Sequence, residues 1–439
     1  MHDLRRQALE SGKTVSRKAK SKQSSAVSSK NNSPSASRSA SRVVSRNVSD
    51  DEDSISDTTS FSVNSIDDVL ADEIDAPEDA WLHSLNDRIG QITDRKRSSV
   101  QGREESLNGF AHILMAHFAR QEIESKMGEL VPAILKSIKA GQSEKETIVA
   151  LKALALLLVT VPSDTVYDSV CGPIKLVIAD SQYAAAKTAA IHTLGVAVFY
   201  GGASLDETQD IMTYLLDIIE SDGQSIEAGD DPVAVTAALE EWGFLATQLE
   251  DMEDTSEEPM EAFIDQLDSS DVGVQVASGE NIALLYEKSF TELEDDEEPD
   301  EADVDGDAED PSAITMVKRY TVYRRQDQLV HKLEELSSAS SKRMSKKDRK
   351  SLHTNFADII NSVEHPSRGP RYSNALDEDT GRAYGSRMTV GVGGKNQLKI
   401  RTWEQLHRLK ALRRILQGGF LVHYADNEVV FDTLPIMLQ

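Results

Sequence analysis

The sequence predicts a mainly α-helical protein: an armadillo- or HEAT-like α-solenoid with a disordered N-terminal arm and a small C-terminal α/β module. Paired apolar stretches at helical spacing recur roughly every 40 residues, the period of such repeats. They stand between a Ser-rich N-terminus and a basic C-terminal part. We therefore expect a disordered arm, Ser/Arg-rich and then acidic, over residues 1–80, an armadillo-like repeat domain over 81–290, an acidic linker over 291–312 and a basic region over 313–439.

The repeat prediction depends on successive helical hairpins. Their two halves are predicted at 130–138 and 148–159, 173–178 and 184–199, 211–219 and 233–249, and 260–267 and 274–286. Equivalent positions follow the period, because Leu135 and Leu176 lie 41 residues apart and Leu154 and Leu194 lie 40 apart. No single hairpin buries its own apolar face, so the stacking of neighbours must supply the core.

The arm is predicted to be disordered because it has too few large apolar residues to offset the chain entropy lost on folding. Its charge changes sign at Ser49, where alternating serines and arginines give way to the acidic run 50–53. Arg42 and Arg46 each precede a serine by three positions, and these serines, Ser45 and Ser49, are candidate phosphorylation sites. Phosphate groups there would offset the positive charge of the arm.

Charge is segregated along the whole chain. Of the net charge of -28, residues 1–49 and residues 311–439 carry +9 each, so the middle carries -46. Thirteen of the 19 residues from 292 to 310 are acidic. Such strong self-repulsion predicts an open linker there, and the two basic ends suit an anionic partner.

Beyond the linker, helical patterns cover 316–336 and, more briefly, 356–363. The chain then predicts a strand-helix-strand-strand module at 397–437. Residues 397–401 alternate like a strand, and Thr402 begins a helix with Gln405 at capping-box spacing. The alternation returns at 420–424 and 429–432, which predicts a hairpin.

Basic side chains of the C-terminal region are candidate contacts to RNA or another anion. One group precedes the second of these helices and the other lies mostly off the apolar face of the module's helix: Lys346, Lys347, Arg349 and Lys350, then Arg408, Lys410, Arg413 and Arg414. Such clusters bind phosphate oxygens in nucleic-acid-binding proteins. Ordinary solvated charge explains both groups as well, and the first group also suits a nuclear-import signal.

No catalytic, cofactor-binding or metal-binding residue is predicted, and we expect a non-enzyme without a small-molecule substrate. Cys171 is the only cysteine, which leaves no disulfide and no cysteine-cluster zinc site. Gly391–Lys395 lacks the spacing of a phosphate-binding loop, and Ser312 stands where a calcium loop starting at Glu301 needs a glutamate. Without a signal peptide or a run of roughly 20 apolar residues, no membrane partner is expected.

Several stretches resemble the interferon-related developmental regulator family. The residues that carry the resemblance are GQSEKETIVALKALA at 141–155, AAAKTAAIHTLG at 184–195, LKIRTW at 398–403 and NEVVF at 427–431, in this order. The similarity extends over about residues 90–290 and 350–437. It implies an armadillo-like region followed by a short C-terminal domain, and a regulator without enzymatic activity.

Alternative functions follow from these observations. In the first, the chain is a regulatory scaffold with protein partners on the solenoid surface, which the resemblance links to transcriptional co-regulation. In the second, the basic C-terminal region associates with ribosomes or RNA, as the resemblance implies for some members. A third, favoured by the acidic middle, is binding of basic proteins as a chaperone or import adaptor. We expect a location in the nucleus and the cytoplasm.

Overall fold

The computed structural model describes residues 80–95, 98–293, 304–305, 316–338, 345–376, 383–386, 388–393 and 396–436. All of them belong to the unit that runs from Asp53 to Gln439. The predicted arm, with Ser45 and Ser49, lies outside these residues up to position 79, and so does most of the predicted acidic linker. Its structure is therefore not part of the description that follows.

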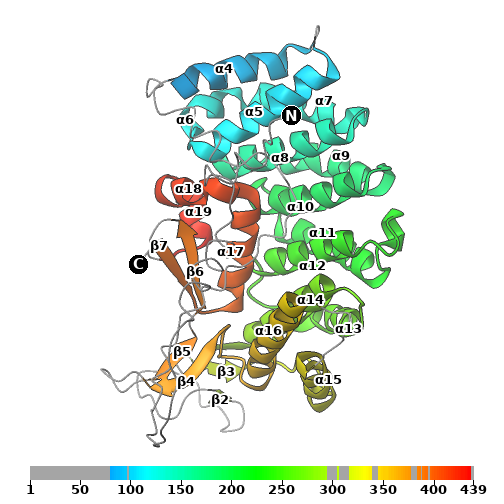
Figure 1. Ribbon diagram of the computed structural model, residues 1–439, viewed down its shortest axis with the longest axis vertical. Helices are drawn as coiled ribbons and strands as arrows, with labels where there is room; N and C mark the ends of the chain where they lie inside the picture. Colours follow the sequence, from blue (N-terminus) through cyan, green and yellow to red (C-terminus); the bar gives the residue numbers. More distant parts are fainter. Residues whose placement is uncertain are drawn as a thin grey trace, which may run out of the picture. The chain divides into compact units, whose positions relative to one another are not determined.

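The repeat domain consists of stacked helical hairpins, as predicted (Figure 1). The hairpins pair α4 (Ala80–Thr93) with α5 (Val100–Ala116), α7 (Met127–Ala140) with α8 (Glu144–Thr160), α9 (Tyr167–Asp180) with α10 (Ala184–Tyr200), α11 (Leu205–Glu220) with α12 (Pro232–Ala246), and α13 (Glu257–Gln266) with α14 (Val272–Lys288). The short α6 (Arg120–Ile123) and η2 (Glu124–Lys126) connect the first two pairs. The mainly α-helical solenoid is thereby confirmed.

The second helices of the hairpins form one continuous stack, because α5, α8, α10, α12 and α14 each contact the next. We call them the inner helices, and α4, α7, α9, α11 and α13 the outer helices. Helices α8 and α10 are apolar around almost their whole circumference, and nearly every residue after their first turns is buried. A helix of that kind needs packing partners on all sides. The outer helices supply only some of them.

The remaining partners come from the C-terminal part of the chain. Helix α17 (Trp403–Leu416) contacts α8, α12 and α14, and η6 (Gln417–Gly419) contacts α5. The short α18 (Phe420–Asp426) and α19 (Glu428–Thr433) contact α5 and α8, respectively. Figure 1 shows these segments, in orange and red, lying along the inner helices. We call α17, η6, α18 and α19 together the C-terminal cover.

The cover corrects one prediction. Residues 396–400 do form a strand, β7, and Thr402 does begin a helix, but 420–424 and 429–432 are helical and not a strand hairpin. Alternation was the wrong signal, because the buried residues of α18 are Phe420, His423 and Tyr424, which share one helical face. The capping box is partly formed: Thr402 Oγ1 accepts from Gln405 N, while Gln405 Oε1 accepts from the amide of Arg401 and not from that of Thr402.

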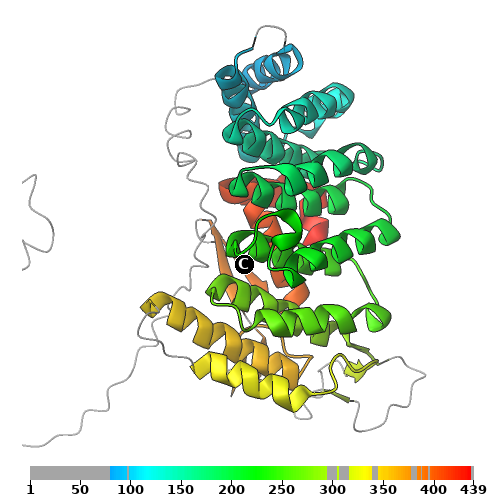
Figure 2. The ribbon, with the colours of Figure 1, turned by 90° about the vertical axis from the view of Figure 1, so that its right-hand side faces the viewer.

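The segment between repeats and cover contains short strands and two helices. Strand β3 (Met316–Lys318) pairs antiparallel with β1 (Phe290–Glu292) and with β2 (Val304–Asp305). Strand β4 (Tyr372–Leu376) pairs with β5 (Ala383–Ser386), and β6 (Met388–Gly393) pairs with β7 (Asn396–Ile400). The two helices, α15 (Gln326–Ser338) and α16 (Lys346–Glu364), pack on each other, and α16 also packs on α14 (Figure 2).

The predicted helix over 316–336 is therefore wrong in its first part. Val317 pairs with both neighbouring strands, and the helix begins only at Gln326. The β-branched residues Val317, Thr321 and Val322 favour extended backbone, and the pairing with β1 satisfies the amides that a helix would have used. The second predicted helix is confirmed as part of α16.

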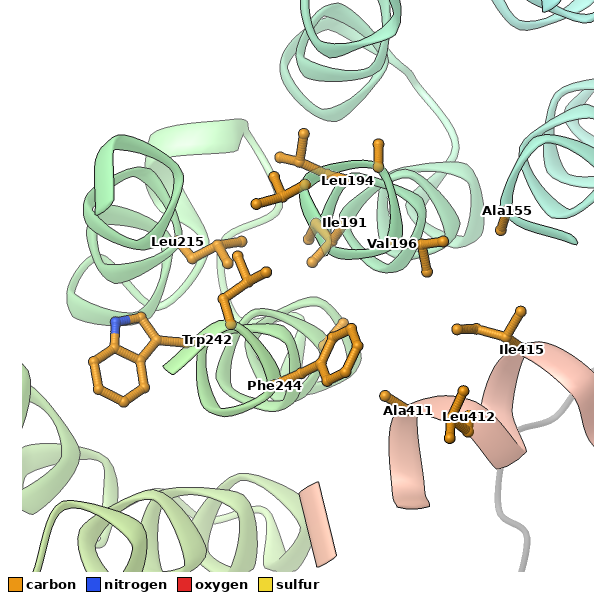
Figure 3. Packing of buried hydrophobic residues seen from close by; sticks show 14 of the residues in the cluster. Ala155, Ile191, Leu194, Val196, Leu215, Trp242, Phe244, Ala411, Leu412 and Ile415 are labelled. Carbon is orange, nitrogen blue, oxygen red and sulfur yellow. The ribbon is translucent and has the colours of Figure 1, made fainter. Parts of the chain in front are cut away.

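Repeats and cover share one hydrophobic core, which runs from Leu85 to Leu434. Leu409, Leu412 and Leu416 of α17 are fully buried in it. Figure 3 shows Phe244 of α12 on the side that faces Ala411 and Leu412. Each such side chain contributes about 1.5–3 kcal/mol by leaving water. Among the described residues, no helix has both the length and the apolar run needed to cross a bilayer.

Gly419 of the cover lies close to the backbone of α5, which allows a first prediction. A methyl group on Gly419 would lie 1.8 Å from the carbonyl oxygen of Met115 in α5. Gly419→Ala should therefore lower the free energy of unfolding by about 2 kcal/mol or more, because backbone must shift. Denaturant unfolding followed by circular dichroism measures this. Gly90→Ala is the matched control: its added methyl meets nothing within 4 Å on the helix α4, so it should gain up to about 1 kcal/mol. Equal stability of the two variants would contradict the packing described.

Candidate functional site

The site that stands out is the contact between the C-terminal cover and the inner helices. It contains four of the predicted anion-contact residues, which all lie on α17: Arg408, Lys410, Arg413 and Arg414. Acidic and amide side chains of α12 and α14 face them from within otherwise apolar helices. We call this contact between the cover and the inner helices the seam. Arg408, Lys410 and Arg414 are bonded within it.

The N-terminus of α17 is held by a carboxylate of α14. Glu287 Oε2 accepts from Trp403 N at 2.7 Å, and Oε1 accepts from Glu404 N at 2.9 Å. Burial raises the pKa of Glu287 to about 7, although both backbone bonds favour its charged form. Trp403 Nε1 donates to Ser362 Oγ of α16 at 2.7 Å. These bonds fix the start of the cover against both α14 and α16.

Along α17 the next anchors are Arg408 and Lys410. Lys410 Nζ lies 2.5 Å from both carboxylate oxygens of Glu280 on α14. Arg408 donates to the carbonyl oxygen of Thr247, after α12, at 2.8 Å and pairs with Glu404 on its own helix at 2.9 Å. Both cations are thus satisfied within the fold.

Arg414 pairs with two carboxylates. Its guanidinium pairs with Glu240 at 2.8 Å and also with the fully buried Glu241, whose Oε1 lies 2.8 Å from His192 Nδ1 of α10. Burial is the largest single influence on Glu240 and favours its neutral form, but Arg414 together with other nearby basic side chains outweighs it and leaves the pKa of this carboxyl lowered. Gly195 makes room for the pair, because a methyl group there would collide with Glu241.

Between these pairs lies a buried histidine. His407 is 5% exposed, and its Nε2 is 3.5 Å from the carbonyl oxygen of Glu280. Burial, together with Lys410, lowers the pKa of His407 to about 3, so the ring is neutral at physiological pH. Asn281 donates to the carbonyl oxygen of Leu239, which ties α14 to α12 at the same level.

The end of the cover is anchored by polar contacts to helix ends. His423 Nε2 lies 2.7 Å from the carbonyl oxygen of Leu114 in α5. Asn427 Nδ2 donates to the carbonyl oxygen of Val159 in α8 at 3.0 Å, and its Oδ1 caps α19. Each of these bonds satisfies a buried polar group. Together they fix the position of the end of the cover relative to α5 and α8.

The predicted anion-contact residues are therefore split between two places. Arg408, Lys410 and Arg414 are bonded within the seam, whereas Arg413 has no ion pair or side-chain hydrogen bond among the described residues. The other group lies in the first turns of α16, where the side chains of Arg349 and Lys350 are exposed. The backbone of Lys346 and Lys347 is in the same helix, and their side chains are outside the description.

The acidic side of the seam was not predicted, although the sequence carried a signal for it. Glu240 and Glu241 interrupt the apolar stretch 233–249, and Glu280 with Asn281 interrupts 274–286. Charged residues within such stretches are buried only when they are paired. The partners of Glu240, Glu241 and Glu280 are cations of a helix at least 130 residues further along the chain, which no local pattern indicates. Within the described parts of the chain, no group of three or more His, Cys, Asp or Glu side chains is placed to hold a metal ion.

Comparison with known proteins adds a family relationship. Residues 47–364 match the family described as Interferon-related developmental regulator. The chain is 26% identical over 356 residues to an uncharacterised protein of Schizosaccharomyces pombe, covering 80% of this chain and 73% of the relative. It is 22% and 21% identical over 403 residues to Interferon-related developmental regulator 1 of Sus scrofa and of Homo sapiens, covering 88% of this chain and 78% of each relative.

The seam predicts a large effect for Arg414. Arg414→Met leaves the buried Glu240 and Glu241 without their guanidinium, which should cost about 3–5 kcal/mol of unfolding free energy. Urea denaturation of the full chain measures the loss. Arg413→Met, on the same turn but without an ion pair among the described residues, should stay within about 0.5 kcal/mol. A small effect of Arg414→Met would mean that the pairs are dispensable.

The buried His407 predicts a pH dependence. Its pKa is about 3 in the folded state and roughly 6.5 in an unfolded chain. As pH falls below roughly 6.5, the unfolded state gains a proton that the folded state does not, so stability is lost by up to about 1.4 kcal/mol per pH unit. His407→Gln removes this dependence, and its stability difference from the parent should shrink between about pH 7 and pH 5.

The comparison with the parent protein is needed because other groups act oppositely. Burial raises the pKa of Glu287 to about 7 and that of Asp358 to about 6, so both favour the folded state as pH falls. These contributions are common to the parent and to His407→Gln, and they cancel in the difference. His331→Gln, at a histidine that is 73% exposed, controls for the substitution itself. Parallel pH profiles of the parent and His407→Gln would contradict the assignment.

Proposed function

The chain belongs to the interferon-related developmental regulator family, and we propose that it is a non-enzymatic regulatory scaffold that binds protein partners through its helical repeats. The finer role that we propose is transcriptional co-regulation, with the protein present in nucleus and cytoplasm. Stacked helical repeats provide long surfaces for partners, which supports a binding function. The family's name, which describes a developmental regulator, also supports a regulatory role.

One observation carries the proposal: the repeats have one covered face and one open face. The C-terminal cover occupies the inner helices, so a partner of the repeats meets the outer helices. On α9, Leu176 is 55% exposed, so this outer helix presents a large apolar side chain to solvent. Beside it, Lys175 Nζ lies 4.7 Å from the centre of the Tyr214 ring of α11. Apolar and aromatic groups next to charge are typical of protein-binding surfaces.

Acidic residues extend this surface on α11 and α13. The pKa of Glu220 is raised by burial and by the nearby carboxylates of Glu258, Asp217 and Asp265. Like charges held this close repel each other, and a basic partner surface relieves the repulsion. We therefore expect partners of the outer face to carry positive charge around an apolar contact.

Leu176 provides the test. Leu176→Arg should reduce the recovery of co-purifying proteins by about tenfold, because a charge replaces the apolar contact. The measurement is affinity purification of the tagged full-length chain at low and high salt, with quantitative mass spectrometry. Val422→Arg, at a 36% exposed residue on the cover, is the matched control and should recover the same proteins as the parent. Equal recovery by both variants would place the partner elsewhere, and no reproducible partner at either salt would sink the scaffold proposal.

The second candidate function is association with ribosomes or RNA. The exposed side chains of Arg349 and Lys350 at the start of α16 favour this function, because exposed cations bind phosphate groups. Such binding weakens as the salt concentration rises. The cations of the seam do not add to this surface while they remain paired. Co-sedimentation with ribosomes that is lost at high salt and in an Arg349→Glu, Lys350→Glu variant would select this function over the scaffold.

A further inference from the structure

A small cavity opens at the seam between the repeats and the cover. It has a volume of about 60 Å³ and lies between α8, α10 and the end of α17. Its lining is mostly apolar and includes Ile148, Ala155, Val196 and Ile415. Figure 3 shows the last three around one space, each on a different helix. The cavity is half open to solvent, so a group from outside can enter it.

The cavity also contains a cation, Lys152, that has no counterion among the residues that the structure describes. Lys152 of α8 lines it, and the only bond of its Nζ among the described residues is to Gln417 Oε1 at 3.1 Å. Other lysines of the seam have carboxylate partners: Lys410 pairs with Glu280 and Lys288 with Glu404. An ammonium has three donors, so Lys152 can accept further partners.

The environment of Lys152 makes the missing counterion significant. Burial lowers the pKa of Lys152 to about 8, with no nearby carboxylate acting against it. Around physiological pH the group is still mostly charged, and a poorly paired charge in an apolar setting is costly. The neighbouring Arg414 does not share this deficit, because two carboxylates neutralise it. His112 of α5 adds positive potential only if protonated, and burial, assisted by Lys152, lowers its pKa.

We propose that this cavity binds an aliphatic side chain of a partner protein whose adjacent Asp or Glu side chain pairs with Lys152. The volume of the cavity limits the size of the aliphatic group, which we call the anchor. A cavity of roughly 150 Å³ holds a benzene molecule, so the present one holds about three or four carbons of a branched aliphatic side chain. The charge of Lys152 determines the residue next to this anchor in the partner, because only an anionic side chain can neutralise the Lys152 ammonium. Because the cavity is not closed, its occupant is one anchor of a longer segment that lies outside it.

This inference rests on the proposed scaffold function only in taking a protein as the ligand. It concerns a different surface from Leu176, since the cavity lies at the cover and Leu176 lies on an outer helix. A peptide that binds the purified chain would support the cavity even if Leu176→Arg had no effect in cells. The two proposals therefore fail separately.

The probe is a fluorescent peptide of alternating leucine and glutamate, blocked at both ends, and binding to the full-length chain is read by fluorescence anisotropy. Lys152→Met should weaken binding by about tenfold or more, because a desolvated charge pair is lost. Lys139→Met is the matched control, at an exposed lysine on the outer helix α7, and should stay within about twofold. Peptides with glutamine for glutamate, or serine for leucine, should also bind about tenfold more weakly.

Two further readouts separate this site from general charge attraction. Ala155→Leu fills the cavity without changing charge and should abolish the leucine-dependent part of binding. Binding to the parent should weaken as the pH rises above the pKa of Lys152, about 8, while the Lys152→Met profile stays flat. Thermal melting should show Lys152→Met at least as stable as the parent, because an unpaired buried charge is removed.

The opposite results would overturn the proposal. No binding of the blocked peptide by the parent would remove the site, and equal losses for Lys152→Met and Lys139→Met would reduce it to surface electrostatics. Binding that requires a free terminal carboxylate on the peptide would show that the anion comes from a chain end and not from an Asp or Glu side chain. Undiminished binding to Ala155→Leu would show that the cavity is not where the aliphatic group lies.

Discussion

The packing of α17 against the inner helices is the contact on which the rest of the structure depends. Its apolar side supplies the burial that drives association, while Lys410 and Arg414 neutralise acids that α12 and α14 carry inside the core. Buried ion pairs add little net stability compared with apolar contacts, but leaving one partner alone is expensive. The pairs therefore set the position of α17 along the stack, and the leucines provide most of the free energy.

Much of this architecture is readable from the sequence, because hairpin formation is governed by local periodicity. The stretches around Leu154 and Leu194 became helices α8 and α10 at the expected spacing. Periodicity alone did not distinguish strand from helix in the short segments after Gly419, where a few residues fit both patterns. Their conformation is set by tertiary contacts, such as the bond from His423 to α5 over 309 residues of sequence.

Long separation in sequence also explains why the cations of the seam are predicted from the sequence and their acidic partners are not. Cations on α17 form a visible cluster, and a cluster invites an external anion as partner. The acids that satisfy them, such as Glu241 and Glu280, are more than 120 residues away and stand in otherwise apolar helices. A basic cluster in a chain with buried acids should first be matched against those acids. The surfaces that we propose for partners are the outer face, the exposed start of α16 and the cavity at Lys152.

Repeat arrays usually behave as one-dimensional chains in which each unit senses only its neighbours. Here the cover joins α5, α8, α12 and α14 directly, so distant hairpins share a single element. Peeling off one end is no longer an independent event, and the array should melt as a whole. During synthesis, however, the inner helices leave the ribosome long before the residues of the cover that shield them. The nascent chain must therefore keep a broad apolar strip from sticking to other chains until its last helices arrive.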